Sequence, residues 1–143
     1  MSDFESFASL LEEVNGKRTK NQRANLLQEN NSAPLRTIMW CLITKPEFVI
    51  SSSGLPDWNE MAMGSAADDE TAMHHFRQWV EKVYVGPSSW SEEKAKTELI
   101  EMCKTYSIDK EDWELLKNIL DNTNPYGKIN SDVAALTWPH MFG

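Results

Sequence analysis

The sequence is poor in the residues that form covalent or metal cross-links. Its two cysteines, Cys41 and Cys103, lie far apart, belong to no Cys-x-x-Cys pair and are expected to be buried core residues. Disulfide-rich secreted domains carry more cysteines, so a reducing, cytoplasmic compartment is expected. Of the three histidines, His74 and His75 are neighbours and His140 is distant. Adjacent side chains on a helix point about 100° apart, so we expect ordinary helical histidines and no metal site.

Long hydrophobic runs are also absent. No apolar segment approaches the roughly 20 residues that are needed to span a bilayer. The N-terminus, Met1 to Glu5, is acidic and lacks the form of a signal peptide. We therefore expect a soluble protein with no membrane partner.

The sequence has no motif for phosphate cradling or for an activated nucleophile. Gly-x-x-x-x-Gly-Lys-Ser/Thr and Gly-x-Ser-x-Gly are both missing. Carboxylates are plentiful, but pairs such as Glu92-Glu93 and Glu111-Asp112 fit the solvated faces of charged helices. We expect no catalytic residue and no cofactor.

Helical periodicity dominates what the sequence does contain. Hydrophobic residues make up 41% and charged residues 25% of the 143 residues, which is a globular composition of single-domain size. No segment alternates with period two for long enough to build a sheet, although residues 48–50 suit a short extended piece. The pattern predicts an all-α fold, one compact domain over residues 1–143 with about six to seven helices. The predicted helices lie over 4–14, from Thr19, from Asn31 or Ser32 to Pro46, over 68–83, from Ser91, from Asp109 and from Asn130.

The net charge of −8 is unevenly distributed along the chain. Residues 15–45 hold six basic residues and one acidic residue, whereas residues 46–73 hold six acidic residues and no basic one. A general nucleic-acid binder is normally basic overall, so a role of that kind would have to depend on the basic segment.

The first candidate site lies in this basic segment. Thr19 and Gln22 have the spacing of a capping box, which predicts a helix start. Basic residues surround this start: Lys17, Arg18, Lys20 and Arg23. The unpaired N–H groups and the positive end of the helix dipole favour a phosphate at such a place. The same residues also suit an ordinary solvated start of a helix.

The second candidate site is the loop at residues 124–131. It contains Gly127 and brings Lys128 to the start of a short helix at Asn130 and Ser131. A glycine-containing loop that delivers a lysine to a helix start can accept an anion. Many loops of this composition only connect two elements, so both interpretations stay open on local grounds.

The order of these features resembles a known family. Residues 17–45 combine a Thr-Lys-x-x-x-x-x-Leu helix, a polar break and a Leu-Arg-rich apolar helix. Residues 113–142 combine a leucine-rich helix, a loop with glycine, a short helix with Ala134-Ala135, and Trp138-Pro139. Both segments are similar to the ends of the N-terminal DNA-binding domain of phage ATP-dependent DNA ligases of the T-even type. The resemblance covers nearly the whole chain in order and spacing.

The resemblance implies an all-helical, non-catalytic domain that grips duplex DNA across the minor groove around a nick. In that family, loops and helix N-termini contact the phosphates. Carried onto this sequence, it implies DNA contacts by Arg18, Thr19, Lys20, Arg23, Gly127, Lys128, Asn130 and Ser131. It further implies a role in phage DNA replication or repair in the cytoplasm of the host cell.

Two features depart from the family. Asn-Thr-Asn-Pro-Tyr at residues 122–126 replaces the basic and acidic residues that often precede the glycine. The adenylation motif Lys-x-Asp-Gly is absent, so this chain is not expected to ligate DNA on its own. It is then either an excised ligase domain or a free-standing relative.

A second hypothesis is a protein-interaction module that binds a phage or host replication protein through an acidic face. It depends on the six acidic residues of 46–73 and on the exposure of Trp58, Met61 and Met63. The two methionines also suit positions against the core, and the sequence leaves both arrangements open.

Overall fold

The structure is a computed structural model that describes residues 4–64 and 68–142, and within these ranges it contains helices and no strand. The predicted all-α fold is confirmed. None of the described helices is long and apolar enough to cross a membrane. The elements are α1 (Phe7–Asn15), α2 (Lys20–Glu29), α3 (Ala33–Thr44), η1 (Ser52–Gly54), η2 (Trp58–Glu60), α4 (Asp69–Val83), α5 (Glu92–Thr105), α6 (Lys110–Leu120), α7 (Ser131–Thr137) and α8 (Pro139–Phe142).

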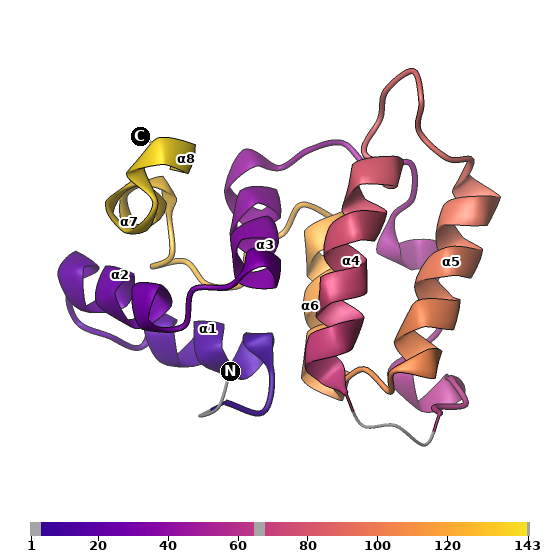
Figure 1. Ribbon diagram of the computed structural model, residues 1–143, viewed down its shortest axis with the longest axis horizontal. Coiled ribbons are helices and arrows are strands. Elements are labelled where there is room, and N and C mark those ends of the chain that lie inside the picture. The colour runs from indigo at the N-terminus through magenta and orange to yellow at the C-terminus, as the bar shows by residue number, and fades with distance from the viewer. Residues whose placement is uncertain (1–3, 65–67, 143) are drawn as a thin grey trace.

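The helix α3 lies at the centre of the molecule (Figure 1). It packs against α4 and α6 on one side and against α7 on the other. The helices α4 and α5 lie side by side at one end, whereas α1, α2, α7 and α8 are grouped at the other. Segments from the two ends of the sequence therefore become neighbours: α2 packs against α7, and α1 packs against α6.

The helix starts follow from local capping chemistry. Side-chain oxygens at the predicted caps accept hydrogen bonds from backbone N–H groups of the first turn, which otherwise lack a partner. These caps are Thr19, Ser32, Ser91, Asp109 and Asn130. Because this signal is local in sequence, these helix starts lie where the sequence predicts them.

The helix α1 begins later than the hydrophobic spacing predicts. Ser6 caps it, so the helix starts at Phe7 and not at Phe4. A second group from a distant element reinforces this start. The carboxyl group of Asp112, on α6, accepts hydrogen bonds from the backbone N–H groups of Phe7 (3.1 Å) and Ala8 (2.7 Å). The true boundary is therefore set partly by a tertiary contact.

The burial of Asp112 corrects a further expectation. Glu111-Asp112 were predicted on a solvated helix face, yet only Glu111 is exposed and Asp112 is fully buried beside Asp69 of α4. Burial raises the pKa of both carboxyls, and the neighbouring carboxyl raises that of Asp112 further. Asp69 Oδ2 is buried with no donor among the described residues unless Asp112 is protonated. A proton on one of the two carboxyls would let it donate to the other and would link α4 to α6, next to the start of α1.

The segment between α3 and η2 packs onto the rest of the protein. Of the extended piece predicted at residues 48–50, only Phe48 takes part in a β-bridge and Val49 is a bend, whose N–H donates to the carbonyl of Val83 (2.9 Å). Phe48 and Tyr84 form an isolated antiparallel bridge. This pairing fixes the end of α4 beside the end of α3, so that Tyr84 lies next to Trp40 with 6.1 Å between ring centroids.

The side chains on which the protein-interaction hypothesis depends are used by the fold. Met61 is buried, and Trp58 and Met63 are half-buried against the core. The Trp58 indole N–H donates to a backbone carbonyl in the loop before α6 (2.8 Å). Asp57, one of the six acidic residues, lies 3.4 Å from the ammonium of Lys117. The expected exposed apolar patch is therefore not found here, and the two methionines take the alternative position against the core.

Both cysteines are core residues, as predicted. Cys41 on α3 and Cys103 on α5 are buried free thiols. Burial raises the pKa of Cys41 to about 12 and also raises the pKa of Cys103. Because the thiolate is the nucleophilic form, a thiol with a raised pKa is poorly reactive.

Candidate nucleic-acid interface

The first predicted site forms an ordered, exposed turn between α1 and α2. Thr19 Oγ1 accepts a hydrogen bond from the N–H of Gln22 (3.1 Å). In return, Gln22 Oε1 accepts from the N–H groups of Arg18 (3.2 Å) and Thr19 (3.3 Å). This capping box fixes the backbone, while Arg18, Thr19 and Lys20 all remain exposed. The turn therefore holds the basic side chains of Arg18 and Lys20 at the surface on an ordered backbone.

Arg23 differs from the other basic residues predicted at this site. It is only 9% exposed, its Nε donates to the carbonyl of Lys17 (3.2 Å), and its Nη2 donates to the carbonyl of Arg18 (3.3 Å). The guanidinium thus closes the turn by binding the two carbonyls that precede Thr19. This geometry supports a positioning role for Arg23, which holds the backbone of Arg18 and Lys17 in place.

The second predicted site is a compact loop with its own internal hydrogen bonds. Asn124 Oδ1 accepts from the N–H of Tyr126 (2.9 Å), and its Nδ2 donates to the carbonyl of Ile129 (3.0 Å). Ile129 is fully buried, so it anchors the loop in the core. Gly127 and Lys128 on the loop are exposed. The loop is ordered by Asn124 and Ile129, and it holds Lys128 at the surface.

The structure brings the two predicted sites together. The backbone N–H of Lys128 donates to Asn15 Oδ1 at the end of α1 (2.9 Å). The ammonium of Lys20, at the start of α2, lies 3.5 Å from a carboxylate oxygen of Asp132, in the first turn of α7. Asn130 and Ser131, which begin α7, are exposed beside this pair. We call the surface formed by residues 17–22 and 127–132 the α2–α7 junction.

Charge at the α2–α7 junction is only partly neutralised. Lys20 is paired with Asp132, and Lys17 lies 3.5 Å from Glu13, one turn earlier on α1. These ion pairs are largely exposed, with side chains 40–69% accessible, so each is weak. Arg18 and Lys128 lie within 4.0 Å of no carboxylate in the described part of the chain. The junction is a locally basic surface on an acidic protein.

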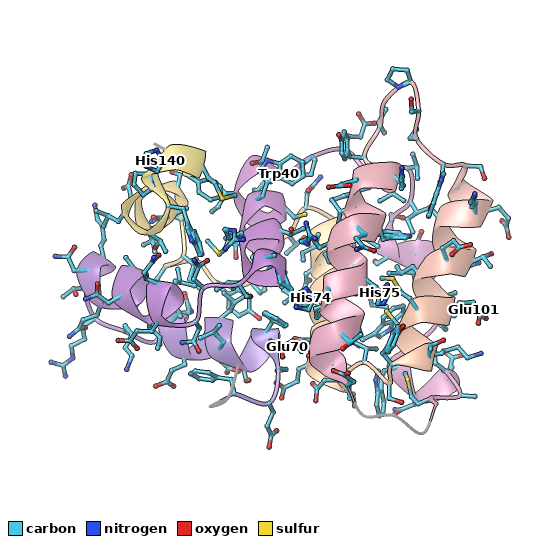
Figure 2. The ribbon with its side chains drawn as sticks, viewed as in Figure 1. Trp40, Glu70, His74, His75, Glu101 and His140 are labelled. Atoms are coloured by element: carbon cyan, nitrogen blue, oxygen red, sulfur yellow. The ribbon has the colours of Figure 1, made fainter. Side chains whose placement is uncertain are left out.

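None of the three histidines belongs to this junction. His74 and His75 project from different sides of α4, and His140 lies on α8 (Figure 2). The ring of His75 stacks on Tyr106 with 4.8 Å between centroids. Among the described residues, no three His, Cys, Asp or Glu side chains form a group that could hold a metal ion.

Comparison with known proteins found no match among family models, curated proteins or solved structures. A function for this chain therefore has to be inferred from the residues of the α2–α7 junction and their geometry.

Proposed function

We propose that the chain is a non-catalytic double-stranded DNA-binding module that contacts the phosphate backbone of nicked duplex without sequence specificity. One observation supports this proposal above the others. The basic start of α2 and the loop that carries Lys128 before α7, more than a hundred residues apart in sequence, meet at one surface. In this proposal Arg18, Lys20 and Lys128 contact phosphates, and Arg23 orders the turn that carries them.

The chemistry of the junction suits a phosphate backbone better than base edges. Lysine and arginine bind phosphate oxygens through charge-assisted hydrogen bonds, and such contacts carry no sequence information. Exposed Thr19, Asn130 and Ser131 add short polar groups beside these lysine and arginine side chains. The first-turn amides of α2 and the positive end of its dipole add to the attraction.

Asp132 gives the junction a competitor for phosphate. Its carboxylate lies 3.5 Å from the ammonium of Lys20, in the position that a phosphate oxygen would take. Both side chains are mostly exposed, so exchanging the carboxylate for a phosphate has a small desolvation cost. We infer that Lys20 leaves Asp132 when the backbone binds, which makes the binding moderate and strongly dependent on salt.

The proposal is tested by fluorescence anisotropy with a labelled nicked duplex. Wild-type protein should bind at micromolar concentration in about 50 mM salt. The double reversal Lys20→Glu/Lys128→Glu should abolish this binding, because it replaces two phosphate contacts with repulsion. Lys96→Glu/Lys110→Glu, which makes the same change of net charge on α5 and α6, should bind far better than the junction variant. No wild-type binding, or equal loss in both double variants, would contradict the proposal.

A further inference from the structure

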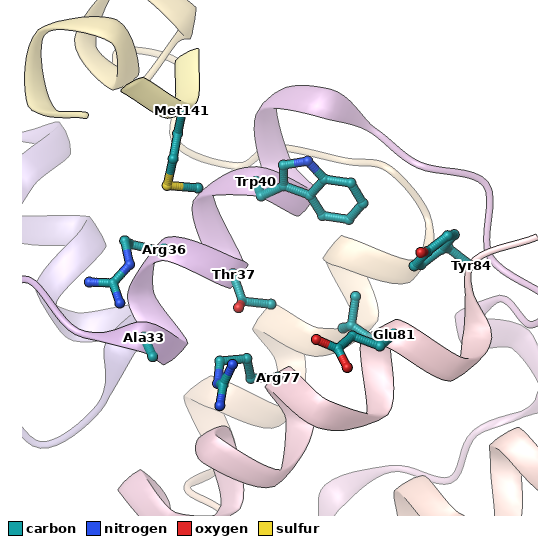
Figure 3. Close-up of a pocket in the computed structure, with 9 residues that line it drawn as sticks. Ala33, Arg36, Thr37, Trp40, Arg77, Glu81, Tyr84 and Met141 are labelled. Atoms are coloured by element: carbon teal, nitrogen blue, oxygen red, sulfur yellow. The ribbon is translucent and has the colours of Figure 1, made fainter. Parts of the chain in front are cut away.

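A groove between α3 and α4 lies apart from the α2–α7 junction (Figure 3). It has a volume of about 350 Å³, which falls in the range of small-molecule sites. Met141 of α8 approaches it from one side. The pairing of residues 47–49 with the end of α4 holds the two helices together at one end of the groove.

One end of this groove is basic and lacks a counter-ion. Arg36 from α3 donates to Asn31 Oδ1 (2.8 Å), and Arg77 from α4 lies nearby. Neither guanidinium lies within 4.0 Å of a carboxylate in the described part of the chain. The Nε of Arg77 is buried and has no acceptor there. A buried donor without a partner calls for an explanation, and an anionic ligand that draws the Arg77 side chain toward the groove would give this N–H an acceptor.

The other end of the groove is aromatic and carries a carboxylate. Trp40 and Tyr84 meet edge to face, with 6.1 Å between centroids and 65° between ring planes. Tyr84 is 43% exposed and lines the groove, so part of its ring is open to a ligand there. Glu81 lies between Arg77 and Tyr84 on the same face of α4 and is exposed. A flat ring can pack against the aromatics while its N–H groups donate to Glu81.

We propose that this groove binds a nucleotide. Its phosphate contacts Arg36 and Arg77, its base packs against Trp40 and Tyr84, and an N–H group of the base donates to Glu81. The order of groups along the groove matches the order within a nucleotide: the basic end takes the phosphate, and the aromatic end with its acceptor takes the base. The arginine fork suits phosphate because it forms two parallel hydrogen bonds. This proposal is independent of DNA binding at the α2–α7 junction.

The test uses AMP as the probe and the indole N–H signals of the six tryptophans in ¹H–¹⁵N spectra. The Trp40 signal is identified by its loss in Trp40→Phe. AMP should move this signal to saturation. Arg77→Gln and Arg36→Gln should each weaken binding by about tenfold or more, since each removes a charge-assisted contact. Lys110→Gln is the matched control and should bind AMP like the wild type. Thermal unfolding of each variant confirms that it is folded.

Adenosine and inorganic phosphate, tested separately, should each bind more weakly than AMP, because each occupies one end of the groove. A 5′-phosphorylated single-stranded oligonucleotide distinguishes a strand end from a free nucleotide. If AMP and the oligonucleotide both shift the Trp40 signal, the groove accepts the end of a strand. If AMP alone shifts it, the groove binds a free nucleotide. A Trp40 signal that does not move at millimolar AMP would overturn the proposal. A Trp40 shift that persists unchanged in both arginine variants would also overturn the proposal. A Trp40 shift that an added acidic peptide produces and AMP does not would overturn it as well.

Discussion

At the scale of single residues, two charged side chains of the same type have different roles. Arg18 is exposed at the α1–α2 turn, whereas Arg23 is 9% exposed and binds the carbonyls of Lys17 and Arg18. Removing the donor of a partly buried carbonyl lowers the free energy of unfolding more than removing an exposed, solvated side chain does. The two arginines should therefore be separable by experiment.

We expect Arg23→Ala to lower the free energy of unfolding by about 1–3 kcal/mol, because it leaves two carbonyls without their donor. Arg18→Ala should change it by less than about 0.5 kcal/mol. Urea denaturation measures both values. For DNA binding the order is different: Arg18→Ala should weaken binding while the protein remains fully stable. Equal stability of the two variants would show that Arg23 does not order the turn.

The buried pair of Asp69 and Asp112 predicts a particular dependence of stability on pH. The pKa of Asp112 is raised from 3.8 to about 9 by burial and by Asp69, so the folded protein binds more protons than the unfolded chain between these values. Stability is therefore highest below about pH 4 with respect to this group, and it falls as the pH rises toward 9. Urea denaturation between pH 5 and 9 should show this fall as a negative slope of unfolding free energy.

Asp112→Asn should flatten that slope, because asparagine does not titrate. Its amide has one acceptor oxygen, whereas the two carboxyl oxygens accept from the N–H groups of Phe7 and Ala8, so the variant should be less stable than the wild type at pH 5. Glu114→Gln, an exposed carboxyl on the same helix, is the control and should retain the wild-type slope. If Asp112→Asn and the wild type lose stability in parallel between pH 5 and 9, the proton shared by the carboxyls is not present.

These residues also mark where sequence-based prediction fails. Asp112 follows Glu111 directly, and the sequence places both on one charged face, but the turn of α6 directs only Asp112 toward α1. Arg23 lies three residues after Lys20 in the same basic segment. Only the packing of α2 determines that the Arg23 side chain is buried while Lys20 is exposed. Burial of a charged residue depends on partners that are distant in sequence, so hydrophobic spacing does not reveal it.

At the scale of elements, local signals were sufficient. The caps at Thr19, Ser32, Ser91, Asp109 and Asn130 depend on hydrogen bonds within four residues. The sequence predicts four of them outright and leaves the cap of α3 open between Asn31 and Ser32. The neighbourhood of α2 and α7 could not be predicted, since it depends on tertiary packing. The groove between α3 and α4 was missed for the same reason, although aromatic and arginine residues spaced four apart on α3 were visible.

The ion pair between α2 and α7 leads to a prediction with two opposite readouts. Asp132→Asn should change the unfolding free energy by less than about 0.5 kcal/mol, because the pair with Lys20 is exposed. It should strengthen binding to nicked duplex by about fivefold at low salt, since one repulsive charge is removed at contact distance. Anisotropy titration measures this gain. Glu98→Gln, which removes a charge from the exposed face of α5, should give a much smaller gain in affinity. Equal gains in the two variants would mean that only the total charge of the protein matters.

At the scale of the whole molecule, the fold brings Lys17, Arg18, Lys20 and Lys128 onto one surface of a protein with a net charge of −8. The six acidic residues of 46–73 belong to the segment that leads from α3 into α4, and none of its described elements is among the principal packing partners of α2 or α7. In the proposed DNA complex, this acidic part of the protein repels the DNA backbone and favours an approach with the junction leading. Net charge alone is therefore a poor guide to binding when opposite charges are segregated.

Binding that uses phosphate contacts alone should not depend on sequence. Nicked duplexes of equal length and different base composition should bind with affinities within about threefold of one another, because each base-specific contact would otherwise contribute roughly 1–3 kcal/mol. Competition titrations with unlabelled duplexes measure these ratios. A preference of a hundredfold for one sequence would indicate base contacts that the junction, as described, does not provide.

The dependence of affinity on salt tests the central claim most directly. Each phosphate contact that is lost should reduce the slope of log K against log salt by about one. Lys20→Gln and Lys128→Gln should each reduce the slope by about one, and the double variant by about two, whereas Lys110→Gln should leave it unchanged. Equal slopes for the wild type and the double variant would show that the α2–α7 junction does not contact DNA phosphates.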